Sequence, residues 1–219
     1  MYGYVMWGDR PALTRQRIAG MWFAVATVPR RGWPFRRRRV LRRLRRSGVV
    51  RCVLPPELEE EAAQSGLLPV EVQRLRCAVL PQLLSKVEGL DRGTAVLRAE
   101  YASPEVWRCA ALLAQRARYV ALEVDGGGEA LAQELRRRFG LCVGRMGETV
   151  VTVSFSGATQ RGRTIHLGAD CHRYQRIEYA LAGDKLGQWP PQEQLLAALF
   201  EGGEIKKEAL CVKTISPNA

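Results

Sequence analysis

Arginine is the residue type most concentrated in one part of this chain, and clustered guanidinium groups are suited to binding phosphates. Between Asp9 and Glu57 there is no acidic residue, whereas this stretch contains 14 Arg. The rest of the 219-residue chain carries 20 basic and 22 acidic residues, so the formal net charge of +12 originates in this stretch. The pattern predicts one polyanion-binding segment in an otherwise near-neutral protein.

Two aromatic residues, Trp33 and Phe35, lie among these arginines and could stack on bases of RNA or DNA. We therefore expect the partner to be a nucleic acid or a phosphorylated ligand. The predicted polyanion-binding residues are Arg30, Arg31, Trp33, Arg36, Arg37, Arg38, Arg39, Arg42 and Arg43.

Three other interpretations of the arginine segment stay open. It could be a solvated helix face, with Trp33 and Phe35 packing the loop onto the core. It could recognise an acidic protein partner. The acidic cluster of residues 57–61 could also fold back onto the arginines, although surface ion pairs stabilise by only about 0–1 kcal/mol each.

A second candidate is the glycine-rich turn Gly126, Gly127 and Gly128, whose backbone N–H groups could cradle a phosphate. The turn lacks the spacing of the known dinucleotide and P-loop motifs, and Glu129 would repel an anion. Asp125 as a helix N-cap is the alternative explanation of the same residues.

Both histidines of the chain lie in a third candidate segment, together with one acid and one thiol: His166, Asp170, Cys171 and His172. These are ligand types for zinc and partners for thiolate catalysis, but no second Cys/His pair exists elsewhere. We predict no metal and no cofactor. A binding or accessory protein is favoured, and the alternative is a small enzyme that uses Asp125, Asp170 or His172 at the strand ends.

The elements that would position these residues alternate between strand and helix. An apolar strand is predicted over Ile18–Val28, a helix over Arg36–Arg46 and a further strand over Val49–Leu54. Such a unit is typical of a parallel crossover, in which ligands bind beyond the carboxyl ends of the strands. The arginine loop after the first strand is expected at that edge.

The same alternation returns within residues 94–144, so we predict an α/β fold, with a doubly wound, mostly parallel sheet and helices on both faces. Parallel βα units are expected over 17–147. Residues 148–219 are expected to add a small antiparallel extension, made of a hairpin, a short helix and a terminal strand. We expect a single domain over 1–219.

Apolar runs are too short for a membrane-spanning helix, since the longest, Ile18–Val28, has 11 residues. The six cysteines are widely spaced and form no C-x-x-C pair. Reduced thiols and a cytoplasmic location without a membrane partner are therefore expected.

Overall fold

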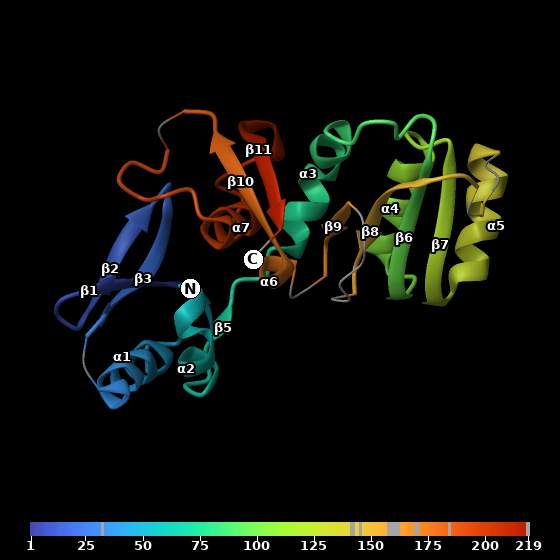
Figure 1. Ribbon diagram of the computed structural model, residues 1–219. Helices are drawn as coiled ribbons and strands as arrows, with labels where there is room; N and C mark the ends of the chain where they lie inside the picture. The colour runs from blue at the N-terminus through green and yellow to red at the C-terminus, as the bar shows by residue number, and fades with distance from the viewer. Residues whose placement is uncertain are drawn as a thin grey trace. The chain divides into compact units, whose positions relative to one another are not determined.

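The computed structural model describes residues 1–31, 33–140, 143, 144, 146–156, 163–168, 171–183 and 185–217, with the backbone alone for 172, 173 and 217. The chain divides into two compact units, each with a sheet of its own (Figure 1). The first unit comprises Met1–Val72 and Tyr179–Cys211, and the second comprises Gln73–Glu178 and Val212–Ala219. The predicted α/β class is confirmed, but the parallel strands that were expected in one sheet form two separate sheets.

The first unit contains a five-stranded sheet in the order β2-β3-β1-β4-β5. Strands β3, β1, β4 and β5 are parallel, and β2 is an antiparallel edge strand beside β3. Its elements are β1 (Tyr2–Gly8), β2 (Ala12–Ile18), β3 (Met21–Pro29), α1 (Pro34–Arg46), β4 (Arg51–Val53), η1 (Pro56–Leu58), α2 (Glu59–Ala63), β5 (Leu68–Pro69), α7 (Glu193–Glu201) and η2 (Lys207–Ala209).

The amino-terminal strands differ from the prediction, because the apolar run Ile18–Val28 is interrupted by a tight turn. Ala19 and Gly20 have φ values of 46° and 98°, and this left-handed pair joins β2 to β3 as a hairpin. Ile18 therefore ends β2, and the parallel strand begins at Met21.

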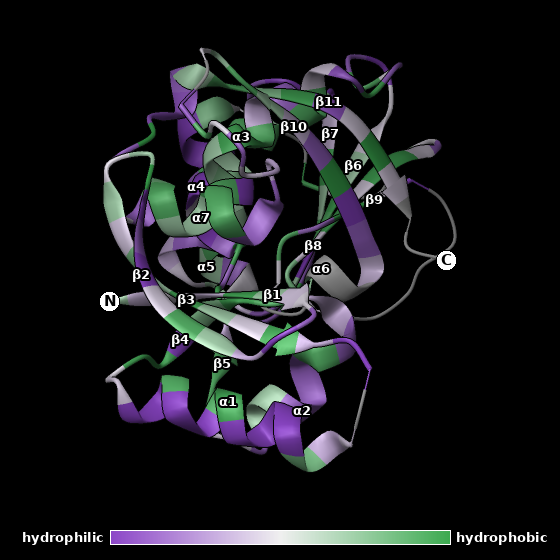
Figure 2. Cartoon of the chain, turned by 90° about the vertical axis from the view of Figure 1, so that its left-hand side faces the viewer, coloured by the Kyte–Doolittle hydropathy of each residue, from purple (hydrophilic) through white to green (hydrophobic). Residues whose placement is uncertain are grey.

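Helix α1 forms because its apolar residues share one side. Leu41 and Leu44 are fully buried and belong to the same core cluster as Ala26 of β3 and Cys52 of β4. Figure 2 shows α1 and α2 side by side on one side of the first sheet and α7 on the other, with hydrophilic residues on the outward side of α1. The predicted strand, helix, strand unit is thus present as β3-α1-β4, with β1 between its two strands.

The second unit contains a four-stranded parallel sheet in the order β7-β6-β8-β9. A parallel bridge between Val120 and Val143 extends it beyond β7. The elements of this unit are α3 (Gln73–Ser85), β6 (Thr94–Tyr101), α4 (Pro104–Ala114), β7 (Tyr119–Gly126), α5 (Gly128–Phe139), β8 (Thr149–Ser154), β9 (Thr164–His166) and α6 (Cys171–Tyr174).

The expected antiparallel hairpin within residues 148–167 is wrong, because β8 pairs parallel with both β6 and β9. Strand β8 is an interior strand, and its side chains are buried on both faces of the sheet. Val151 and Val153 lie on one face, and Thr152 and Ser154 lie on the other. Alternation of residue types identifies a strand, but the direction of its partners depends on how the chain returns to the sheet.

The small antiparallel pair expected near the carboxyl terminus is confirmed as β10 (Gln175–Leu181) and β11 (Leu210–Pro217). Across the described ranges, no helix is long and apolar enough to span a membrane.

Candidate functional site

Most of the predicted arginines lie on the solvent side of the first unit. We define the arginine surface as the exposed arginines of α1 and its preceding loop whose side chains make no ion pair or hydrogen bond with the described residues. They are Arg30, Arg31, Arg36, Arg38, Arg39, Arg42, Arg43, Arg45 and Arg46.

The spacing of the arginine surface follows the helical period. One stripe lies opposite the buried leucines, and it consists of Arg36, Arg39, Arg43 and Arg46. Residues at i, i+3, i+7 and i+10 share one side of a helix, and ten residues rise about 15 Å. The stripe therefore presents a row of cations on a helix that Leu41 and Leu44 anchor to the core.

Arg37 differs from its predicted neighbours, because its charge is used within the unit. Its guanidinium pairs with Glu61 of α2 at 3.2 Å, donates to the Arg30 carbonyl at 3.0 Å and lies 5.4 Å from the ring centroid of Trp7. The acidic cluster of residues 57–61 thus neutralises part of the arginine segment through Glu61.

Trp33 and Phe35 are exposed to 71% and 61%, so they do not pack the loop onto the core. Trp33 is the N-cap residue of α1 but provides no side-chain hydrogen bond to the helix. Two aromatic faces therefore lie open to solvent at the end of the arginine stripe.

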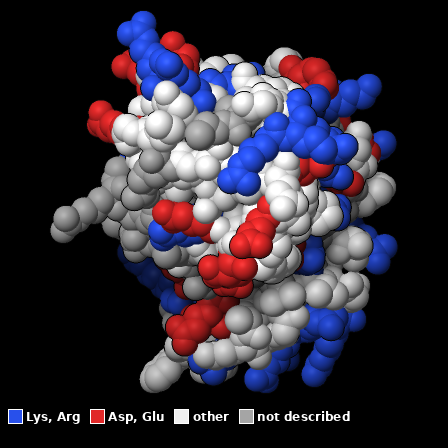
Figure 3. Space-filling model, turned by 90° about the vertical axis from the view of Figure 1, so that its right-hand side faces the viewer, with Lys and Arg blue, Asp and Glu red and all other residues white. Residues whose placement is uncertain are grey.

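Basic residues of the second unit are arranged differently. Arg137 and Arg138 of α5 both donate to Glu134, and these hydrogen bonds, led by that from Arg137, lower the pKa of Glu134 to about 2. Figure 3 shows the face on which α5 lies, the right-hand side of Figure 1, with acidic side chains gathered across its middle and basic ones interspersed. The face of α5 therefore carries charges of both signs, whereas the arginine stripe of α1 contains no acidic residue.

The glycine turn is explained by packing within the second unit. Gly127, with a φ of 80°, is the N-cap of α5, so the expectation of an Asp125 N-cap is wrong and Asp125 is instead an exposed residue of β7. A side chain at Gly126 would meet Tyr101 and the Glu100 carbonyl. Phosphate binding by Gly126, Gly127 and Gly128 stays a prediction.

A row of polar residues crosses the second sheet near its carboxyl edge. Arg98 of β6 is in register with Glu123 of β7 and Ser154 of β8, and Ser154 is in register with His166 of β9. Residues in register project from the same face of a sheet. This edge, where the chain order reverses between β6 and β8, is the usual ligand position in such sheets.

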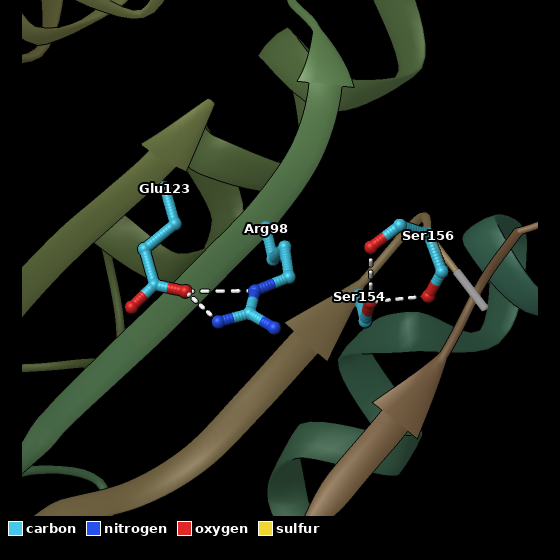
Figure 4. Close-up of polar contacts among 4 residues, drawn as sticks. All are labelled: Arg98, Glu123, Ser154 and Ser156. Carbon is cyan, nitrogen blue, oxygen red and sulfur yellow. Dashed lines mark hydrogen bonds and ion pairs between the residues drawn. The ribbon is translucent and has the colours of Figure 1, made fainter. Parts of the chain in front are cut away.

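The contacts within this row are shown in Figure 4. Both Nε and an Nη of Arg98 donate to one carboxylate oxygen of Glu123, the former at 2.7 Å, and each partner is about one third exposed. Ser154 donates to the Ser156 carbonyl at 2.6 Å. None of the sequence patterns above predicts Arg98, Glu123, Ser154 or Ser156 as site residues, although the lone charge within the apolar run 94–99 marks Arg98.

His166 is buried, and its Nδ1 has no hydrogen-bond partner among the described residues. Its ring stacks on the ring of Tyr174, with the two ring centroids 5.2 Å apart. Burial, with a smaller effect of the Arg76 charge, holds the pKa of His166 below its usual value, so the neutral imidazole is favoured. Arg76 itself is fully buried and donates to the carbonyls of the surrounding segment.

The other members of the predicted histidine cluster cannot be assembled into a site. Asp170 lies outside the described residues, and His172 is described by its backbone alone, within α6. Cys171 is buried. Among the residues with described positions, no group of three His, Cys, Asp or Glu side chains could hold a metal ion.

Comparisons of this chain with protein-family models, with curated proteins and with solved structures find no match.

Proposed function

We propose that the first unit binds nucleic acid through the arginine surface of α1. The observation that carries this proposal is the alignment of Arg36, Arg39, Arg43 and Arg46 on the solvent side of one anchored helix, with no ion-pair partner among the described residues.

The electrostatics of α1 favour a bound anion over solvent alone. Arginines three and four positions apart repel one another, which destabilises a helix by about 0.2–0.5 kcal/mol per pair. Arg36 and Arg37 also lie in the first turn, where the helix dipole is positive and no acidic residue is present. A polyanion along this side would relieve both effects.

Nucleic acid suits this surface better than a small phosphorylated ligand does. The stripe extends about 15 Å, so it can contact several phosphates of one strand. Exposed Trp33 and Phe35 adjoin it and can stack on unpaired bases. We therefore expect single-stranded RNA or DNA to bind.

The test is fluorescence anisotropy with a labelled 20-nucleotide single strand of mixed sequence, between 50 and 200 mM salt. The variant carries Arg36→Gln, Arg39→Gln and Arg43→Gln. Each phosphate contact contributes about 0.7 to the slope of log affinity against log salt, so the variant should lose a slope of about 2. Absence of binding by the unmodified chain at 50 mM salt would overturn the proposal.

A matched control removes the same charge from the second unit. Arg74, Arg108 and Arg136 are exposed residues of α3, α4 and α5, and their replacement by Gln should leave the slope within about 0.5 of the unmodified value. Equal weakening by both triple variants would mean that net charge alone drives binding. Poly-glutamate that binds as tightly as the oligonucleotide would instead favour an acidic protein partner.

A further inference from the structure

The face of the first sheet that α1 covers continues onto the edge strand β2. Antiparallel pairing places Arg15 of β2 opposite Ala24 of β3, and Arg17 opposite Trp22. Residues in register project from the same face of a sheet, as do residues two positions apart on one strand. Ala24 belongs to the core cluster that also contains Leu41 of α1. Three residues therefore lie on the α1 side of the sheet, and we call them the hairpin patch: Arg15, Arg17 and Trp22.

The hairpin patch is open to solvent and adjoins α1. Leu13, two residues before Arg15, projects from the same face and packs against the core cluster beneath α1. Arg15 is exposed and makes no ion pair or hydrogen bond with the described residues. Trp22 is 58% exposed. The sheet beside α1 thus presents a cation and an aromatic ring, the two residue types that also make up the arginine segment.

Two arginines of the stripe border the hairpin patch. Arg45 lies against Gly66, shortly after α2, so this flank of α1 faces α2. The sheet order places β2 at the edge opposite β5, which α2 contacts. The flank of α1 away from α2 carries Arg36 and Arg43, which lie two turns apart on one side of the helix. These two arginines consequently face the side on which β2 lies.

The positive surface has a defined end at the turn between β2 and β3. No acidic residue occurs between Asp9 and Glu57, so β2, β3 and α1 contribute no anion. At the turn itself, a side chain at Gly20 would meet the carboxylate of Glu204, which arrives from the carboxyl-terminal part of the first unit. A polyanion that follows α1 can therefore extend over Arg15, but the carboxylate repels it at the turn.

Exposed aromatic residues lie at both ends of α1. Because α1 connects the parallel strands β3 and β4, it runs from the carboxyl edge of the sheet back to the amino edge. Trp33 and Phe35 lie where α1 begins, at the carboxyl edge, whereas Trp22 lies near the start of β3, at the amino edge. The 13 residues of α1 rise about 20 Å between these ends.

We propose that the single strand held on the arginine surface continues onto the hairpin patch, where Trp22 stacks on a base and Arg15 contacts a phosphate. This inference rests on the proposed function of α1. It adds a second stacking position, at the opposite end of α1 from Trp33. Arg17 contributes charge, but its Nε also donates to the Gly20 carbonyl at 2.8 Å and holds the turn, so the test leaves it in place.

The test measures anisotropy with two labelled 20-nucleotide strands, one complete and one with abasic sugars throughout. Trp22→Leu should bind the complete strand about fivefold or more weakly, the loss expected for one base stacked on an aromatic ring. Trp22→Phe keeps an aromatic ring and should bind within about threefold of the unmodified chain. The abasic strand should bind all three proteins equally, because it has no base to stack. Tyr101→Leu is the matched control, since Tyr101 is 65% exposed and belongs to the second unit.

The phosphate contact is tested through the salt dependence of binding. Arg15→Gln should reduce the slope of log affinity against log salt by about 0.7, the contribution of one phosphate contact to single-strand binding. Arg74→Gln removes the same charge from an exposed position of the second unit and should leave the slope unchanged.

The outcomes separate this inference from the proposed function. If the complete strand binds Trp22→Leu as tightly as the unmodified chain, while the slope still depends on the arginines of α1, the hairpin patch is overturned and the function of α1 stands. Equal weakening of the complete and abasic strands by Trp22→Leu would also overturn it, because the ring would then act on the fold instead of on a base. If neither strand binds the unmodified chain, both proposals are wrong.

Discussion

Replacement of Arg76 by Met should destabilise the second unit, because this arginine holds three backbone carbonyls in the interior. Arg76 is fully buried and donates to the carbonyls of His166 at 2.9 Å, Cys171 at 3.2 Å and Gln175 at 2.6 Å. These bonds fix the chain from the end of β9 through α6 to the start of β10 on helix α3.

The expected loss follows from these three contacts. Each buried carbonyl left without a donor costs about 1–3 kcal/mol, while removal of a buried guanidinium recovers several kcal/mol of desolvation. Three carbonyls without donors cost about 3–9 kcal/mol together, and because the recovered desolvation offsets part of this cost we expect a net loss of about 3–5 kcal/mol. With a urea dependence of about 2 kcal/mol per M, the midpoint should fall by about 2 M.

Urea unfolding followed by circular dichroism measures this change. The control is Arg74→Met, since Arg74 is an exposed residue of the same helix and should change stability by less than about 0.5 kcal/mol. A loss below about 1 kcal/mol for Arg76→Met would refute the reasoning, because the three carbonyls would then find other donors at little cost.

Two further predictions concern titratable groups. Since burial and the Arg76 charge hold the pKa of His166 below 6.5 in the folded chain, its contribution to stability is complete above that pH and is lost as the pH falls through the lowered pKa. His166→Gln should therefore reduce the difference in unfolding free energy between pH 7.5 and 5.5, and an unchanged difference would contradict this cause. Burial raises the pKa of Cys52 to about 12, so only about one thiol in 10⁴ is ionised at pH 8, and a disulfide reagent should modify exposed Cys211 first. Peptide mass mapping measures the order in which the two thiols are modified, and the unfolded chain serves as the control. Equal rates of modification of Cys52 and Cys211 in the folded chain would contradict the burial of Cys52.

The helix of the arginine surface could be predicted from local pattern alone. Leu41 and Leu44 are spaced for one side of a helix, and the arginines of that helix that lie away from this side, before and between the leucines, must face solvent. Exposure of Arg36 and Arg39 follows from that geometry. The hairpin of β2 and β3 could not be predicted in the same way, because Ala19 takes a left-handed φ that its residue type disfavours.

The contacts of the carboxyl edge depend on residues far apart in the chain. Arg98 and Glu123 meet because β6 and β7 pair in register, and Ser154 joins them because the chain returns to the other side of β6. A charge within an apolar strand signals an unusual position, but its partner becomes known only with the order of strands.

The sequence by itself determined the α/β class, the location of the excess positive charge and the side of α1 that faces solvent, because these depend on composition and on periods of a few residues. Tertiary structure decided that the charge of Arg37 is neutralised, since the packing of α2 on α1 brings Glu61 to within 3.2 Å of its guanidinium. It also decided the contact between the rings of Tyr4 and Trp189, which are far apart in the chain but have centroids 4.7 Å apart. Local sequence patterns do not predict such pairs, because contacts between distant segments form when whole helices and strands pack against one another.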